Sequence, residues 1–243
     1  MADNTQTTSR NVDIVFCIDA TGSMMPCLDM VKKNALKFRQ DFVDLAMMEN
    51  NTSVDSLNIQ VIAFRDYLDD GDQAMIKSEW FDMLAGDEDK YAAFLNGIVA
   101  DGGGRSLEES GLEALYMAMT TDWASRGDKD RQIIVLFTDA DALDLMTPDR
   151  QSQPAYPRDM VDMNGLISLW EGFMPAYMSQ GDLKLRNRCK RLIMYAPAGS
   201  KYEQLSTMLK SSQFIPVDLS QGLGDIDFTD VIKTILASVS SGS

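Results

Sequence analysis

Short apolar runs alternate along the chain with longer segments in which apolar residues recur at helical spacing. The apolar runs predict strands at Val12–Asp19, Leu57–Phe64, Arg131–Thr138, Arg191–Ala196 and Phe214–Asp218. Two of these runs contain the sequences IIVLF and LIMY, which are apolar at every position. Because successive side chains of a strand point to opposite faces, such runs are typical of a parallel sheet covered on both sides.

The segments between the strands predict helices. From Leu28 to Leu45, apolar residues recur about every 3.6 residues, which places them on one helix face. Similar patterns predict further helices at Leu107–Thr121, Met163–Gln180, Lys201–Leu209 and Phe228–Val239. Lys77–Met83 is interpreted as a short edge strand or hairpin arm. The alternation predicts an α/β fold: a doubly wound, mostly parallel central sheet with one short antiparallel edge strand and helices on both faces.

A single domain accounts for the length of 243 residues, and we expect it to span residues 12–239. Residues 1–11 and 240–243 are mostly polar and are predicted to be disordered ends. Ala140–Met160 is a long irregular stretch that holds three of the seven prolines. A loop of this length in a compact domain usually has a function.

Composition restricts the chemistry and the partners. The net charge of −15 argues against nucleic acid and anionic membranes as partners. The chain has no histidine, which excludes Ser-His-Asp and Cys-His catalysis as well as histidine-bound zinc. A metal site would therefore use oxygen ligands, which favours a hard cation such as Mg²⁺. Three scattered cysteines and the lack of an apolar signal segment predict a cytoplasmic protein without structural disulfides.

Oxygen-bearing side chains follow the carboxyl ends of the predicted strands, the edge where doubly wound sheets bind ligands. Asp19 ends the first strand, and Thr21 and Ser23 come directly after it. Asp66 follows the second strand, and Asp139 follows the third. Carboxylates gathered in this way repel one another, and a divalent cation relieves the repulsion.

A glycine-rich loop, ADGGGRSLEESG, lies between the second and third strands and contributes Ser106. Glu108 and Glu109 in this loop are interpreted as the acidic first turn of a helix, where the helix dipole favours negative charge. For Asp19-Ala-Thr-Gly-Ser alone, the competing interpretation is a helix N-cap, because serine and threonine oxygens accept hydrogen bonds from free backbone N–H groups.

Asp19-Ala20-Thr21-Gly22-Ser23 resembles the D-x-[ST]-x-S motif of von Willebrand factor A (vWA) domains, and GGGRS and LFTDA stand where that family has its second and third motifs. The resemblance covers roughly residues 12–239. The variant is similar to an intracellular bacterial subgroup with D-x-T-G-S-M, which includes domains attached to alpha-type kinases and stand-alone proteins of stress-response operons. The family's motifs form a metal-ion-dependent adhesion site.

The resemblance implies that Asp19, Thr21, Ser23, Ser106 and Asp139 hold the metal. Asp66 would support it from outside the ligand shell, unless it pairs with the neighbouring Arg65. Mg²⁺ is the expected ion, with Mn²⁺ or Ca²⁺ as alternatives. An Asp or Glu of a partner protein would complete the coordination, so the implied function is metal-dependent protein interaction, without catalysis.

Two alternatives remain open on the sequence. The first is a Mg²⁺-dependent phosphohydrolase with Asp19 as nucleophile. Phosphotransferases of the haloacid-dehalogenase type have a second Asp two residues later, whereas this chain has Thr21. The second is a metal-free vWA scaffold, because Arg105 stands where the subgroup often has an aspartate and would weaken the metal site by pairing with a carboxylate.

Overall fold

The computed structural model describes residues 7–102, 107–174, 178, 183–217 and 226–240. Its strands are β1 (Thr8–Asp19), β2 (Thr52–Phe64), β3 (Met75–Lys77), β4 (Phe81–Asp82), β5 (Glu108–Glu109), β6 (Asp130–Phe137), β7 (Asp141–Ala142), β8 (Lys190–Pro197) and β9 (Ser212–Val217). Its α-helices are α1 (Met25–Asn34), α2 (Phe38–Asn50), α3 (Tyr67–Asp70), α4 (Glu88–Gly97), α5 (Gly111–Met119), α6 (Pro148–Gln151), α7 (Met163–Trp170), α8 (Lys201–Met208) and α9 (Phe228–Ser240). Short 3-10 helices span Gly22–Met24 and Gly71–Gln73.

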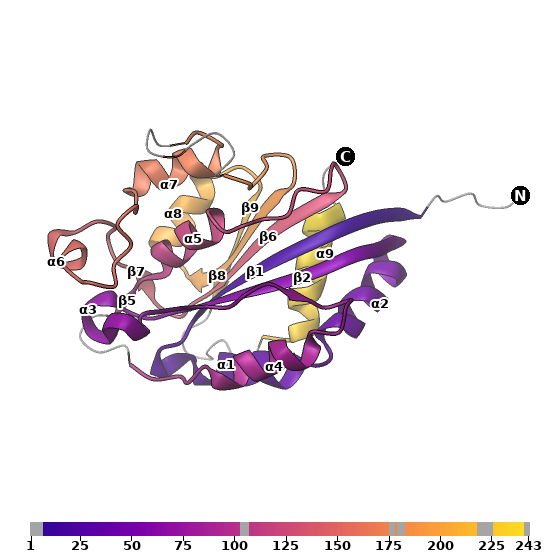
Figure 1. Ribbon diagram of the computed structural model, residues 1–243, viewed down its shortest axis with the longest axis horizontal. Helices are drawn as coiled ribbons and strands as arrows, with labels where there is room; N and C mark the ends of the chain where they lie inside the picture. The colour runs from indigo at the N-terminus through magenta and orange to yellow at the C-terminus, as the bar shows by residue number, and fades with distance from the viewer. Residues whose placement is uncertain (1–6, 103–106, 175–177, 179–182, 218–225, 241–243) are drawn as a thin grey trace, which may run out of the picture.

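The central sheet has the order β3-β2-β1-β6-β8-β9 (Figure 1). Strands β2, β1, β6, β8 and β9 are parallel, and the short β3 and β4 both pair antiparallel with β2. The predicted doubly wound α/β fold is therefore confirmed. The segment expected to form one edge strand, Lys77–Met83, is divided between the end of β3 and β4.

Helices cover both faces of the sheet (Figure 1). Helices α1, α2, α4 and α9 bury their apolar residues against one face, and α5, α7 and α8 against the other. Strand β1 serves both cores, because Ile14, Phe16 and Ile18 belong to the first and Val15 and Cys17 to the second. This alternation explains why the central strands are apolar at consecutive positions.

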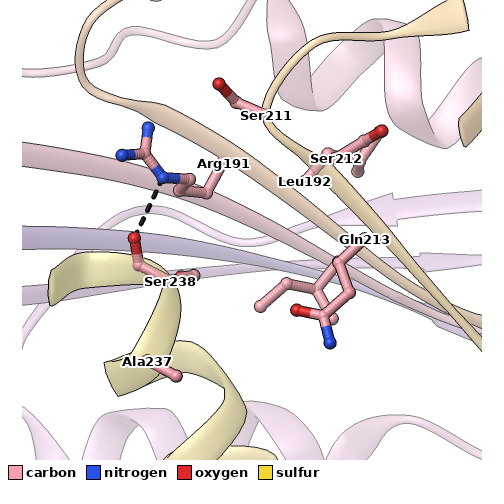
Figure 2. A pocket seen from close by; sticks show the side chains of 8 residues that line it. Arg191, Leu192, Ser211, Ser212, Gln213, Ala237 and Ser238 are labelled. Carbon is pink, nitrogen blue, oxygen red and sulfur yellow. Dashed lines mark hydrogen bonds between the residues drawn. The ribbon is translucent and has the colours of Figure 1, made fainter. Parts of the chain in front are cut away.

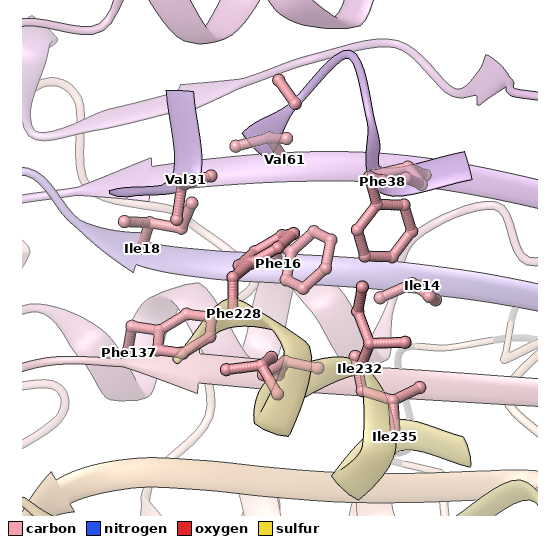
Figure 3. Packing of buried hydrophobic residues seen from close by; sticks show 14 of the residues in the cluster. Ile14, Phe16, Ile18, Val31, Phe38, Val61, Phe137, Phe228, Ile232 and Ile235 are labelled. Atoms are coloured by element: carbon pink, nitrogen blue, oxygen red, sulfur yellow. The ribbon is translucent and has the colours of Figure 1, made fainter. Parts of the chain in front are cut away.

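Aromatic packing fixes the first core (Figure 3). The ring centroids of Phe16 in β1 and Phe38 in α2 are 5.7 Å apart, and Phe38 lies 5.7 Å from Phe228 at the start of α9. Edge-to-face contacts at such distances add to the free energy that burial alone provides. They hold the first turn of α9 against Phe38 of α2, which in turn packs on Phe16 of β1.

The structure moves several predicted boundaries. Strand β1 begins at Thr8, inside the segment 1–11 that was predicted to be disordered, because residues from Thr8 onward pair with β2. Their side chains are polar, so the apolar pattern carried no sign of this pairing. The predicted helix through Leu28–Leu45 is two helices, separated at residues 35–37. Residues 1–6 and 241–243 lie outside the described part.

Helix α7 is shorter than its predicted span, Met163–Gln180, because Gly172 ends it. Gly172 has φ +88°, and the amide N–H of Phe173 donates to the carbonyl of Ser168 over 2.8 Å. A left-handed glycine with this hydrogen bond is the usual way to terminate a helix. Position 180 lies outside the described residues.

Helix α5 begins at Gly111, whereas the prediction placed its start at Leu107. Glu108 and Glu109 instead form β5, which pairs in parallel with β7. The interpretation of these two glutamates as a first helical turn was therefore wrong. Its cause is tertiary, because the partner strand β7 belongs to the loop after β6 and left no local pattern in the sequence.

The long loop 140–160 is mostly irregular, as predicted, and contains the short elements β7 and α6. A buried ion pair attaches it to the domain. Nη2 of Arg150 lies 2.7 Å from Oε1 of Glu113 in α5, and the hydroxyl of Tyr156 donates to the same oxygen over 3.0 Å. Nη2 of Arg150 also donates to Oγ of Ser110 over 2.6 Å. The loop is thereby fixed next to β5.

Candidate metal site

The candidate site lies at the carboxyl ends of β1 and β6, which are neighbours in the sheet. From β1 the chain continues to β2 on one side, whereas β6 lies on the other side, so the order of the strands reverses between β1 and β6. Doubly wound sheets open a crevice at such a reversal. Asp19 ends β1, and Thr138 and Asp139 follow β6.

Asp19 is fully buried, and both of its carboxylate oxygens accept hydrogen bonds. Oδ1 accepts from the backbone N–H of Thr21 over 2.9 Å and from the Thr21 hydroxyl over 2.6 Å. Oδ2 accepts from the hydroxyl of Thr138 over 2.7 Å. Burial outweighs these hydrogen bonds and raises the pKa of Asp19 to about 6.

Ser23 connects the loop after β1 with the loop after β6. Its hydroxyl donates to Oδ1 of Asp139 over 3.1 Å, and its oxygen lies 3.4 Å from the hydroxyl of Thr21. Thr21 is the residue before the 3-10 helix Gly22–Met24, and its side chain makes no capping hydrogen bond there. The hydroxyls thus face carboxylates and not free backbone N–H groups, which contradicts the N-cap interpretation.

A pocket of about 520 Å³ opens over this group. Its lining includes Thr21, Ser23 and Asp139. Leu107 and Glu109, which follow the glycine-rich segment in the sequence, also line the pocket. A second pocket, of about 410 Å³, lies near the amino end of β8, where Nε of Arg191 donates to the carbonyl of Ser238 over 2.9 Å (Figure 2). This second pocket lies at the amino ends of β8 and β9, whereas the candidate site lies at the carboxyl ends of the strands.

Arg65 fixes the loops around the candidate site. This buried guanidinium donates to the backbone carbonyls of Ala20 (3.1 Å), Gln73 (3.4 Å) and Val99 (2.7 Å). Asp66 has a different role from pairing with it: Oδ1 accepts from the N–H of Leu68 over 3.0 Å and caps α3. Asp66 is buried, and its support of a metal from outside the ligand shell stays a prediction.

Glu109 is buried at the pocket, with a carboxylate oxygen, Oε2, that has no hydrogen-bond partner. Burial, followed by the negative charges of Asp19, Asp66 and other nearby aspartates, raises the pKa of Glu109 to about 9. Burial and nearby like charges both disfavour the ionised form of a carboxyl group. The donor set, two hydroxyls with carboxylates and no nitrogen or sulfur, matches the preference of Mg²⁺.

The carboxylates are not sufficient by themselves. In the described part of the chain, no three acidic or cysteine side chains are grouped closely enough to hold an ion. A metal here would depend on the hydroxyls of Thr21 and Ser23 and on retained water, as is common for Mg²⁺. The residues therefore fit a hydrated Mg²⁺ ion held by hydroxyl and carboxylate oxygens.

The structure brings together Asp19, Thr21, Ser23 and Asp139, as predicted from their motifs. Ser106 and Arg105 lie outside the described residues, so their roles stay predictions. Sequence reasoning assigned no role at the site to the hydroxyl of Thr138, although this residue ends the predicted strand Arg131–Thr138. It also assigned Glu109 to a helix start, and no local signal could have corrected that.

Comparison with known proteins supports the fold alone. No protein-family model matches the chain, and no curated protein matches it. A solved structure with a similar fold is the pilus adhesin SpaC from Lactobacillus rhamnosus GG, with a TM-score of 0.50 and 12% sequence identity over 93% of this chain. A structure of that adhesin in an open conformation gives a TM-score of 0.48 and 11% identity over 95% of this chain. The matched regions make up 31% and 30% of the adhesin chains, so this chain spans less than a third of their length. Within the described ranges, no helix is long and apolar enough to cross a membrane.

Proposed function

We propose that this chain is a protein-interaction module of the vWA type that binds its partner through a divalent metal ion. Thr21 and Ser23 hold Mg²⁺ with their hydroxyls, and Asp19 and Asp139 hold it directly or through water, with Ser106 as a further candidate. The ion supplies a positive charge that attracts an Asp or Glu of the partner protein. The setting we propose is a bacterial intracellular signalling or stress-response complex.

One observation carries this proposal. The side-chain oxygens of Asp19, Thr21, Ser23 and Asp139 form a continuous series of contacts of 2.6, 3.4 and 3.1 Å at the edge of a pocket. A cation at this edge would be an electrostatic link between an acidic chain and an acidic partner. It is the feature that reconciles the net charge of −15 with an acidic ligand.

The rim of the pocket supports protein binding. Leu107 lines the pocket, and 92% of its surface is exposed. A single exposed leucine is ordinary on a protein surface. Because Leu107 lines the same pocket as the candidate metal ligands, it could make an apolar contact with a partner beside the charged contact at the metal.

The environment of Asp19 favours binding over hydrolysis. A carboxylate nucleophile needs an oxygen that faces the substrate. Both oxygens of Asp19 accept hydrogen bonds from threonine groups, and the residue is fully buried. The metal-free scaffold remains the alternative that the first experiment must test.

That experiment is a calorimetric titration of the chelator-treated chain with Mg²⁺. We expect saturable binding by the parent and loss of binding in Asp19→Ala. Ser23→Ala removes one hydroxyl from an exposed position and should weaken binding at little cost in stability. Ser206→Ala in α8 is its matched control and should bind as the parent does. Failure of the parent to bind Mg²⁺ or Mn²⁺ would leave the metal-free scaffold. Capture of a partner with and without chelator then tests the interaction itself.

A further inference from the structure

Glu109 is held rigidly at the pocket by its backbone. It lies opposite Ala142 in the parallel pairing of β5 with β7, and its carbonyl accepts from the N–H of Leu143 over 3.0 Å. The strand β7 belongs to the loop that begins at Asp139. Glu109 is therefore fixed to the same segment that carries one of the proposed ligands.

The side chain of Glu109 is buried in a position that leaves its carboxyl group incompletely hydrogen-bonded. Only 4% of the residue is exposed, and Oε2 has no hydrogen-bond partner. The guanidinium of Arg150 lies in the same region but bonds Glu113 and Ser110. The guanidinium of Arg65 donates to three backbone carbonyls. A buried polar atom without a hydrogen bond destabilises the fold. Glu109 also lines the pocket that Thr21, Ser23 and Asp139 line.

We propose that Glu109 is a further acidic residue of the metal site and holds Mg²⁺ through a metal-bound water. This inference rests on the proposed function. We assign Glu109 a water-mediated role and not a direct one, because no three acidic side chains in the described ranges are grouped to hold one ion directly. Mg²⁺ keeps several of its waters in proteins, and carboxylates commonly accept their hydrogen bonds.

The consequence concerns the order of binding. With Asp19, Asp139 and Glu109 around one cation, the chain supplies three acidic groups of its own. The free chain should therefore bind Mg²⁺ before any partner arrives. The glycine-rich segment then contributes an acidic group whatever the role of Ser106.

The test compares two neighbouring glutamates. Glu109→Gln removes the charge and keeps the size of the side chain. Glu108→Gln is the matched control, because the Glu108 side chain is 43% exposed and lies 3.6 Å from Nζ of Lys201. Mg²⁺ affinity is measured by calorimetry, and the bound-metal environment by the electron paramagnetic resonance spectrum of Mn²⁺.

We expect Glu109→Gln to bind Mg²⁺ at least about tenfold more weakly. A loss of this size is typical when a residue that hydrogen-bonds a metal's ligands or bound waters is removed. The Mn²⁺ spectrum should change in this variant and stay the same in Glu108→Gln. Glu109→Asp keeps the charge on a shorter side chain, so its affinity should fall between those of the parent and Glu109→Gln. It also serves as the test if Glu109→Gln does not fold, which circular dichroism would show.

The outcomes separate the two proposals. Equal affinities for the parent and the Glu109 variants would overturn the role of Glu109 and leave the metal-dependent function intact. No Mg²⁺ or Mn²⁺ binding by the folded parent would overturn both. A drop of equal size in Glu108→Gln would mean that general negative charge, and not a specific group, governs the affinity, which also overturns the inference.

Discussion

The hydroxyl of Ser23 donates to Oδ1 of Asp139 over 3.1 Å, although the two residues belong to loops that follow different strands. Strands β1 and β6 place them together, because they are parallel neighbours whose carboxyl ends meet at one edge. The contact joins the two halves of the proposed metal site. A substitution of Asp139 therefore tests the proposed metal site directly.

Asp139→Asn should reduce the affinity for Mg²⁺ at least about tenfold, which corresponds to about 1.4 kcal/mol of binding free energy. The change removes one negative charge and retains an oxygen for Ser23. Asp144→Asn is the control in the same loop, since its side chain is 76% exposed and contacts Lys201. Calorimetric titration of both variants checks the prediction. Unchanged affinity in Asp139→Asn would contradict it.

The stability of the metal-free chain should fall as the pH rises. Burial and neighbouring carboxylates raise the pKa of Glu109 from its ordinary 4.5 to about 9. The folded chain therefore keeps a proton that the unfolded chain releases above about pH 4.5. This contribution to the free energy of unfolding is full below that pH and is lost as the pH approaches 9. The pKa of Asp19, raised to about 6, adds a smaller loss between pH 4 and 6.

Thermal melts in chelator between pH 5 and 9 measure this dependence. Each kcal/mol lost lowers the melting temperature of a chain of this size by about 2–4 °C. Glu109→Gln should flatten the curve above pH 6, and Glu108→Gln should leave it as in the parent. A melting temperature that rises across this range in the parent would show that the assigned sign is wrong.

Removing one partner of the buried Arg150–Glu113 pair should destabilise the fold strongly, whereas replacing both partners by apolar residues should change the stability little. Arg150→Met leaves the Glu113 carboxylate buried without its cation, so we expect a loss of about 3–5 kcal/mol in the free energy of unfolding. The double variant with Glu113→Leu removes both charges and should recover most of that loss. Urea denaturation of the parent, both single variants and the double variant measures the coupling. Additive losses would mean that the pair does not act as a unit.

Gly102 provides a test of the glycine-rich segment. Its φ of +77° is unfavourable for other residues, and a Cβ there would lie 2.1 Å from Oδ1 of Asp70. Gly102→Ala should therefore destabilise the chain by about 1 kcal/mol or more and weaken Mg²⁺ binding at the pocket that Gly102 lines.

Gly97→Ala is the matched control. This glycine ends α4 with open space around its Cβ position and without a positive φ. Alanine there should raise the free energy of unfolding by up to about 1 kcal/mol and leave metal affinity unchanged. Equal stability losses in Gly97→Ala and Gly102→Ala would show that the positive φ of Gly102 is not the cause of its destabilisation.

The central sheet and one side of the candidate site were predictable because their signals are local. Consecutive apolar residues mark β1 and β6, and a strand that ends on Asp19 places Thr21 and Ser23 at a known edge. Parallel pairing then brings Asp139 to the same place. The length of α7 was overestimated, because one glycine ended it within an apolar pattern that continued.

The sequence by itself determined the alternation of strands and helices, the exclusion of histidine chemistry and the motif residues at the ends of β1 and β6. The tertiary structure decided that Glu109 is a buried pocket residue, that Arg65 holds three loops and that Arg150 pairs with Glu113. The physical reason is the range of the interactions. Periodicity reflects neighbours within a few residues, whereas β5 exists only because β7 pairs with it, and a buried charge finds its partner only when distant segments pack together.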